Sequence, residues 1–208
     1  MKKYRNIIFD VGDVLLDYRW KEMLMQDYGL DEPTTELLGP EMFADSLWHE
    51  FDLWNYSEEE IIQAFEAKYP EHGAHIRWFI THGELMKVPR PEVYKRVRQL
   101  KEQGYGVYLL SNYPESLFKK HTDGADFMKA IDGAVVSYQI HKTKPEREIY
   151  DYLIDTYQLN REECLFFDDR LENVKGSMNW GIDAKQVLSQ EGLVEDLDAI
   201  LAGGFELL

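Results

Sequence analysis

The sequence predicts an α/β fold: a mostly parallel sheet with helices on both faces, and a small all-helical segment inserted after the first strand. Short apolar runs that end on polar residues alternate with segments of helical periodicity, which is the pattern of a parallel sheet. Residues 19–87 depart from this pattern, show no strand alternation and hold four of the five tryptophans. We therefore expect a core domain at 1–18 and 88–208 and a helical domain at 19–87.

The first strand is predicted at Ile7–Phe9 and ends on a carboxylate, Asp10. Ligands of open α/β sheets bind at the carboxyl ends of the strands, so Asp10 lies where a site is expected. Gly12 lets the chain turn sharply and brings a main-chain carbonyl close to whatever Asp10 holds. Taken alone, the stretch is equally consistent with a strand end followed by a turn.

The inserted segment contains a helix start that the sequence defines well. Ser57 and Glu60 have the spacing of a capping box, and four apolar residues follow at helical spacing: Ile61, Ile62, Phe65 and Tyr69. Most aromatic side chains of the segment are expected to pack within it. The chain returns to the core at Val88-Pro89-Arg90-Pro91, because paired prolines are typical of a boundary.

The rest of the chain repeats the alternation of helix and strand. Helices are expected from Pro91 to a C-terminal glycine at Gly104, from Pro145 onward, and over 193–201; strands are expected at 105–110, 134–136, 165–167 and after Gly181. Two of these strands end on Ser111-Asn112 and on Asp168-Asp169. Parallel strands share one carboxyl edge, so these residues should meet Asp10 in space.

The chemistry of the gathered residues points to phosphate and a metal. Asp10, Asp168 and Asp169 repel one another unless a cation is present, and carboxylate oxygens suit Mg²⁺. An aspartate is also a competent nucleophile. Ser111 and Asn112 can donate hydrogen bonds to an anion, and Lys144 precedes an expected helix start, where it can supply a fixed positive charge.

Four motifs in this order resemble the haloacid dehalogenase superfamily. They are Asp10–Val14, Leu110–Asn112, Lys144–Tyr150 and Phe166–Asn173. The resemblance spans the whole chain and implies a Rossmann-like core, with residues 19–87 as the helical cap. The overall pattern is most similar to small bacterial phosphatases that act on sugar phosphates.

The resemblance also implies a role for each matching residue. Asp10 would be the nucleophile, Ser111 and Asn112 the phosphate ligands, and Lys144 the charge clamp. The metal ligands would be Asp10, the Gly12 carbonyl and Asp169, with Asp168 beside them as a ligand or a residue that supports one. The implied cofactor is Mg²⁺, and the implied partner is a small phosphorylated substrate.

Two departures from the family pattern concern proton transfer. Most phosphatases of this family carry a second aspartate at the position of Gly12, as general acid and base. Asp13 is one residue further on and should point elsewhere. Without that acid we expect a preference for aryl and anomeric sugar phosphates, unless the cap or His141, three residues before Lys144, supplies the proton.

Three functions follow from these residues. The first is a Mg²⁺-dependent phosphomonoester hydrolase with an aspartyl-phosphate intermediate. The second is a 2-haloacid dehalogenase in which Asp10 attacks carbon; Gly12 suits it, but the pair Asp168-Asp169 does not, because it repels a carboxylate substrate. The third is an inactive binding module that has lost the general acid.

Composition excludes other classes of function. The 208 residues have a formal net charge of −16, which repels nucleic acid and anionic membranes, so neither is expected as a partner. Cys164 is the single cysteine, which fits a reducing compartment. The apolar run before Asp10 is too short for a signal peptide, and we expect a cytoplasmic protein.

Overall fold

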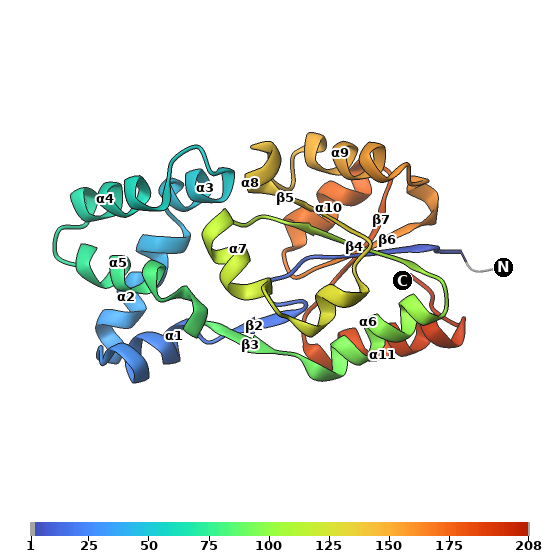
Figure 1. Cartoon of the computed structure of the whole chain (residues 1–208), viewed down its shortest axis with the longest axis horizontal. Helices are drawn as coiled ribbons and strands as arrows, with labels where there is room; N and C mark the ends of the chain where they lie inside the picture. The colour runs from blue at the N-terminus through green and yellow to red at the C-terminus, as the bar shows by residue number, and fades with distance from the viewer. Residues whose placement is uncertain (1–2, 208) are drawn as a thin grey trace.

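A computed structural model describes residues 3–207 and shows a five-stranded parallel sheet flanked by helices (Figure 1). The strand order is β5-β4-β1-β6-β7. The strands are β1 (Asn6–Phe9), β4 (Gly106–Ser111), β5 (Gly133–Val136), β6 (Cys164–Asp168) and β7 (Asp183–Gln186). The expected fold class is confirmed: a mostly parallel sheet with helices on both faces and a helical insertion after the first strand.

Alternate residues of the central strand enter two separate apolar cores. Ile7 and Phe9 pack on the face covered by α6 (Pro91–Glu102) and α11 (Gln190–Ala202), whereas Ile8 packs on the face covered by α9 (Arg147–Tyr157) and α10 (Leu171–Asn179). Figure 1 shows these two helical layers on opposite sides of the sheet. Because successive strand residues point to opposite faces, a continuous apolar run is what a sheet buried on both sides requires.

The register of the strands brings their polar ends together. Phe9 pairs with Leu109 of β4 and with Phe167 of β6. The next residues along the three strands therefore reach the same edge, and the Asp10 amide donates to the Phe167 carbonyl at 2.9 Å. This edge faces the helical insertion (Figure 1).

The insertion consists of helices between two short antiparallel strands. The strands are β2 (Leu16–Tyr18) and β3 (Lys87–Pro89), paired so that Leu16 lies opposite Pro89. The helices are α1 (Trp20–Glu22), η1 (Met23–Tyr28), α2 (Glu32–Phe43), α3 (Ser46–Leu53), α4 (Glu58–Lys68), α5 (Gly73–Thr81) and η2 (Gly83–Leu85). The capping box of Ser57 and Glu60 is confirmed at the start of α4.

Several short helices complete the core. They are α7 (Glu115–Thr122), η3 (Asp126–Ala130), α8 (Ser137–Ile140) and η4 (Arg161–Glu163). One sequence expectation about a helix start is wrong: α9 begins at Arg147, not at Pro145, because the Glu146 amide donates to the Thr143 carbonyl in a turn that precedes the helix. Lys144 therefore lies in this turn rather than next to the first turn of α9.

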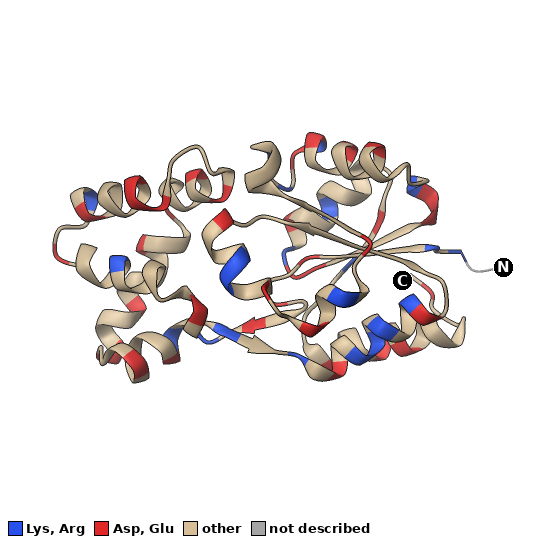
Figure 2. Ribbon diagram, viewed as in Figure 1, with Lys and Arg blue, Asp and Glu red and all other residues tan. Residues whose placement is uncertain are grey.

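The negative charge of the chain is spread over its outside. Acidic residues lie on helices of both the insertion and the core (Figure 2). Among residues 3–207, no helix is long and apolar enough to span a membrane. The division into a core (1–18 and 88–208) and a cap (19–87) remains a prediction.

Candidate active site

Asp10 and Lys144 form the buried centre of the strand edge. Asp10 is 8% exposed and Lys144 is 4% exposed, and Asp10 Oδ1 lies 3.0 Å from Lys144 Nζ. The Ser111 hydroxyl donates to the same oxygen at 2.5 Å. Burial raises the pKa of Asp10, although the Lys144 charge and the Ser111 hydrogen bond oppose that effect. The second oxygen, Oδ2, takes part in none of these contacts.

Lys144 is held rigidly at both its ends. Its ammonium lies between Asp10 and Asp168, with a hydrogen bond of 2.6 Å to Asp168 Oδ2. Burial lowers the pKa of Lys144, but the two carboxylates outweigh this and raise it, so the ammonium is charged. The Asn112 amide bonds the Lys144 main chain twice, accepting from its N–H at 2.8 Å and donating to its carbonyl at 3.0 Å. Asn112 thus positions Lys144, and one of its amide hydrogens remains for a ligand.

The two carboxylates of the fourth motif have different surroundings. Asp168 is fully engaged: it accepts from Lys144, from the Arg170 amide at 2.8 Å and from Asn173 Nδ2 at 3.0 Å. Within residues 3–207, the Asp169 carboxylate has no such partner. Burial, together with the charges of Asp10 and Asp168, raises the pKa of Asp169 to about 7.

This arrangement fits a divalent cation. One oxygen from each of Asp10, Asp168 and Asp169 lies within 4.8 Å of the others. Three carboxylates face one lysine, which leaves an excess of two negative charges when all are ionised. The unpaired Asp169 oxygens and the Gly12 segment border the same cavity. Oxygen donors of this kind are the ligands that Mg²⁺ takes in proteins.

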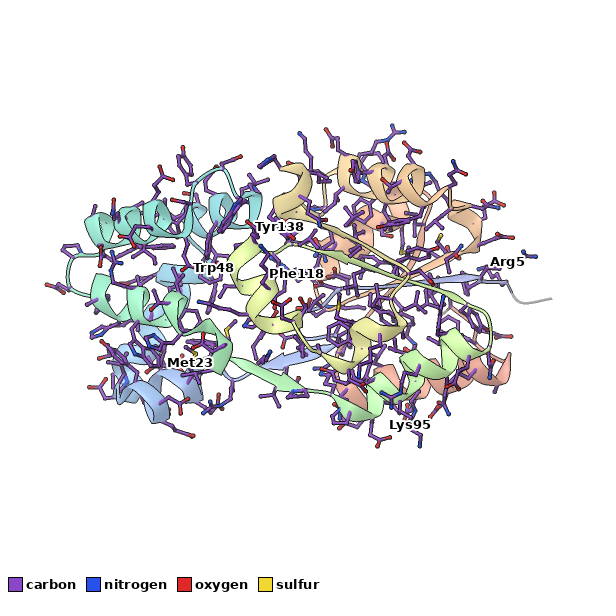
Figure 3. The ribbon with its side chains drawn as sticks, in the orientation of Figure 1. Arg5, Met23, Trp48, Lys95, Phe118 and Tyr138 are labelled. Atoms are coloured by element: carbon purple, nitrogen blue, oxygen red, sulfur yellow. The ribbon has the colours of Figure 1, made fainter. Side chains whose placement is uncertain are left out.

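The cavity above Asp10 has a volume of about 280 Å³, and the insertion closes one side of it. Three aromatic residues of the insertion line it: Trp20, Phe43 and Trp48. Phe43 packs edge-on against both tryptophans, with ring centroids 5.3 Å from Trp20 and 4.8 Å from Trp48. Trp48 lies on the side of the insertion that faces Phe118 and Tyr138 of the core (Figure 3). The other two tryptophans of the insertion do not line the cavity, and Trp78 stacks on Tyr28, as expected of packing residues.

A tyrosine ring fills the place of the missing aspartate. A Cβ atom on Gly12 would lie 2.6 Å from Cε2 and 2.7 Å from the hydroxyl oxygen of Tyr18. Only a residue without a side chain fits there while Tyr18 keeps its position. The loss of the aspartate and the presence of Tyr18 are therefore structurally coupled.

Tyr18 begins a hydrogen-bonded chain whose direction the structure defines. His121 Nε2 lies 2.8 Å from the Gly83 carbonyl, which can only accept, so this nitrogen carries the hydrogen. Burial lowers the pKa of His121 to about 4, so the ring is neutral and its Nδ1 accepts from Tyr113 at 2.7 Å. The Tyr113 oxygen then accepts from the Tyr18 hydroxyl. The Tyr18 proton thus points away from Asp10.

Two other residues considered from the sequence make their hydrogen bonds away from Asp10, although Asp13 lines the cavity. Asp13 has a left-handed backbone (φ 51°), and its carboxylate accepts from the Tyr18 amide. Burial and the charge of Asp17 raise the pKa of Asp13, and the charge of Arg90 opposes them. His141 does not line the cavity; its Nδ1 lies 2.7 Å from the Leu53 carbonyl of the insertion. His141 therefore holds the insertion against the core.

The predicted site residues all border this cavity or the groups beside it. Asp10, Gly12, Ser111, Asn112, Lys144 and Asp169 line it, and Asp168 lies behind Lys144. The sequence did not single out Tyr18, Trp20, Phe43, Asp52 or Arg170, which also line it. Asp52 could have been singled out from the sequence, because it follows Trp48 by four residues. On a helix this spacing places its carboxylate on the same face as the tryptophan ring.

Comparison with known proteins agrees with these motifs. A family model described as haloacid dehalogenase-like hydrolase matches residues 4–177. The chain belongs to this family. It is accordingly a hydrolase of this family, which favours the two enzymatic functions over the non-enzymatic alternative.

Curated relatives of this hydrolase include both phosphatases and a dehalogenase. A sesquiterpene phosphatase of Aspergillus oryzae is 23% identical, covering 82% of this chain and 83% of its own. A D-ribitol-5-phosphate phosphatase of Bacteroides thetaiotaomicron is 24% identical, covering 95% and 98%. An (S)-2-haloacid dehalogenase of Burkholderia cepacia is 22% identical, covering 89% and 84%.

Solved structures share the fold of this hydrolase. A family enzyme of Bacteroides thetaiotaomicron, in complex with magnesium and inorganic phosphate, has a TM-score of 0.67 at 18% identity, covering 88% of this chain and 93% of its own. A protein of Porphyromonas gingivalis, described as a predicted haloacid dehalogenase-like family hydrolase, has a TM-score of 0.67 at 22% identity, covering 88% and 91%.

Proposed function

We propose that this hydrolase is a Mg²⁺-dependent phosphomonoesterase that works through an aspartyl-phosphate intermediate. The observation that carries the proposal is the Asp169 carboxylate, half-buried beside Asp10 and Asp168 with no hydrogen-bond or ion-pair partner of its own in residues 3–207. Such a group is costly unless a cation binds beside it. A phosphatase uses that cation, and the complex of a structural neighbour with magnesium and phosphate supports the same interpretation.

The charge of the site argues against the dehalogenase alternative. A 2-haloacid brings a carboxylate of its own into a site where three carboxylates already face one lysine. Carbon attack by Asp10 gains nothing from the Asp169 charge, which would repel this substrate. A phosphate dianion is repelled too, unless the cation is present, so the site requires both ligands together.

The residues of this chain divide the reaction between them. Mg²⁺ held by Asp10, Asp169 and the Gly12 carbonyl would neutralise charge on the phosphoryl oxygens. Lys144 offers a fixed ammonium on the other side, and Ser111 and the free Asn112 hydrogen can donate to phosphoryl oxygens. Asp10 attacks phosphorus, the ester oxygen departs, and water then hydrolyses the aspartyl phosphate.

The cavity suits a small organic group on the phosphate. Its volume of about 280 Å³ lies at the lower end of small-molecule sites. Trp20, Phe43 and Trp48 present aromatic surface opposite the phosphate end, and such surface stacks on the apolar faces of sugars. We therefore place the substrate among small phosphorylated metabolites and favour sugar phosphates; the D-ribitol-5-phosphate phosphatase relative supports that choice. Cys164, a buried free thiol, agrees with a cytoplasmic location.

A substrate panel separates the candidate activities. Phosphate monoesters and 2-haloacids are assayed with the purified protein in Mg²⁺ and in EDTA, and Asp10→Asn serves as the matched control for the nucleophile. We expect phosphate release that requires Mg²⁺ and is lost in Asp10→Asn. Halide release in EDTA without phosphate release would overturn the proposal in favour of the dehalogenase.

A further inference from the structure

The cavity contains one carboxylate that the proposed mechanism does not use. Asp52 lies in the last turn of α3 in the insertion and lines the cavity beside Asp10, Lys144 and Arg170. Within residues 3–207, its side chain makes no hydrogen bond and no ion pair. A carboxyl group in this position is free to meet a bound ligand.

The end of α3 is fastened to the core, which fixes Asp52 over the site. The Ser137 hydroxyl donates to the Asp52 carbonyl at 2.5 Å, and His141 Nδ1 lies 2.7 Å from the Leu53 carbonyl. Ser137 is fully buried and also accepts from the Tyr113 amide at 2.8 Å. Three core residues around the site therefore determine where Asp52 lies.

The electrostatic surroundings of Asp52 differ from those of a surface carboxylate. Burial raises its pKa to about 7; Arg170 and Lys144 oppose the shift, and Asp10 adds to it. Arg170, Lys144 and Asp10 all belong to the core, and so does Tyr113, the other titratable group that interacts with Asp52. At neutral pH the carboxyl group can therefore both give and take a proton.

The other titratable groups of the cavity do not fit the role of acid. Tyr18 occupies the space beside Gly12, but its hydroxyl proton is donated to Tyr113, and burial raises its pKa well above the ordinary value. Asp13 accepts from the Tyr18 amide and is influenced by Arg90 and Asp17. Lys144 is committed to its two ion pairs.

We infer that Asp52, on the insertion, is the general acid and base that replaces the aspartate absent at Gly12; this rests on the proposed phosphatase function. In the first half of the reaction, Asp10 forms a bond to phosphorus, the bond from phosphorus to the ester oxygen breaks, and that oxygen takes the proton of Asp52. In the second half, the Asp52 carboxylate takes a proton from water. The water oxygen then bonds to phosphorus, the bond to Asp10 breaks, and Asp52 is protonated again.

The test compares leaving groups in matched variants. The kcat/KM of wild type, Asp52→Asn and Asp13→Asn is measured with Mg²⁺ on two kinds of substrate. The first is p-nitrophenyl phosphate, whose leaving group, p-nitrophenolate, departs without a proton. The second is a set of primary alkyl phosphates, whose leaving group requires one. Glu50→Gln, a half-buried position on α3 whose carboxylate accepts from Asn55 and does not line the cavity, serves as the helix control. Thermal melts establish that each variant is folded.

We expect Asp52→Asn to lose about 10²-fold or more on alkyl phosphates and less than about 10-fold on p-nitrophenyl phosphate. The fall of wild-type kcat/KM above pH 7 on alkyl phosphates should disappear in this variant. Equal losses on both substrates, or the selective loss in Asp13→Asn instead, would overturn the assignment. A wild type that releases no phosphate from any ester would refute the phosphatase itself, which is a distinguishable outcome.

Discussion

At the scale of single residues, the two adjacent carboxylates of the site, Asp168 and Asp169, differ in their hydrogen-bond and ion-pair partners. Asp168 accepts hydrogen bonds from Lys144, Arg170 and Asn173, whereas Asp169 has no such partner, and the negative charges around it outweigh the positive charge of Lys144. Burial without a counter-charge destabilises a carboxylate, and a bound cation relieves that cost. We therefore propose different roles for the two adjacent aspartates: Asp168 orients Lys144, and Asp169 binds the metal.

Asp169→Asn tests this difference without an activity assay. Its folded-state pKa of about 7 exceeds the unfolded value of 3.8, so the ionised group destabilises the metal-free protein at pH values above about 4. We expect Asp169→Asn to raise the metal-free stability by on the order of 1 kcal/mol at pH 8 and to abolish the rise in melting temperature caused by Mg²⁺. The measurement is differential scanning calorimetry in EDTA and in Mg²⁺.

Asp168→Asn is the matched comparison for this experiment. It removes a partner of the buried Lys144 ammonium and should therefore destabilise the protein in EDTA. If Asp169→Asn is also destabilised in EDTA, the Asp169 carboxylate is not the strained group.

The close approach of Tyr18 to Gly12 predicts that substitutions at these two positions have non-additive effects on the free energy of unfolding. Gly12→Ala places a Cβ 2.6 Å from the Tyr18 ring and should cost about 1–3 kcal/mol of stability. In the Tyr18→Ala background the space is open, so the same substitution should cost much less. Urea unfolding of the four proteins gives the coupling energy. Additive losses would show that Tyr18 does not fill the position of the missing aspartate.

At the scale of elements, the sequence predicted the strands well and the insertion poorly. The central strands β1, β4 and β6 contain short apolar runs buried on both faces, so their ends are visible where a polar residue such as Asp10 or Ser111 appears. The chemistry of the insertion depends on which helix faces meet the core, and periodicity does not define that. Asp52 and Tyr18 reach the site only through the packing of α3 and the pairing of β2 with β3.

The helix that carries Asp52 has a strong N-cap. Asp45 accepts from the Leu47 amide at 2.9 Å and from Lys68 and Tyr69 of the α4 segment, both at 2.5 Å. Burial alone would raise the pKa of Asp45, but these hydrogen bonds outweigh it and lower the pKa to about 2. This N-cap therefore joins the start of α3 to the α4 segment.

Asp45→Ala should lower the free energy of unfolding by about 1–2 kcal/mol, and Asp45→Asn by less, because the amide oxygen still accepts from Leu47. The ionised form stabilises the fold above the unfolded pKa of 3.8, and this contribution is lost as the pH falls through about 2. The difference between wild type and Asp45→Asn should thus narrow between pH 4 and pH 2. Chemical denaturation at pH 7, 4 and 2.5 measures it, and a difference that does not change with pH would contradict the assignment.

At the scale of the whole molecule, the insertion is joined to the core by two strands and a few docking contacts. The strands β2 and β3 pair with each other outside the main sheet, and Ser137 and His141 bind the end of α3. Opening would break these contacts and admit substrate, whereas closure would exclude water. The family motifs were predictable from the sequence because each is a short local pattern. The contacts of Ser137 and His141 with the end of α3 were not predictable, since they join residues more than 80 positions apart.

Closure can be observed by hydrogen exchange. With Mg²⁺ and vanadate as the phosphate mimic, we expect slower exchange at 15–19, at 87–91 and at the end of α3. Ser137→Ala should speed exchange at the end of α3 in the free protein, because the Asp52 carbonyl loses its donor. Unchanged exchange at both hinge stretches, with vanadate demonstrably bound, would contradict a mobile cap and the division of the chain into two domains.

The most direct test of the central claim is chemical trapping of the Asp10 intermediate. Wild type is mixed with Mg²⁺ and a phosphate ester that it turns over, quenched in acid within one turnover, and reduced with borohydride, which converts an aspartyl phosphate to homoserine. Peptide mass spectrometry should find homoserine at position 10 in wild type and not in Asp10→Asn. Release of phosphate in the same time with Asp10 unmodified, or homoserine at another aspartate, would contradict Asp10 as the nucleophile.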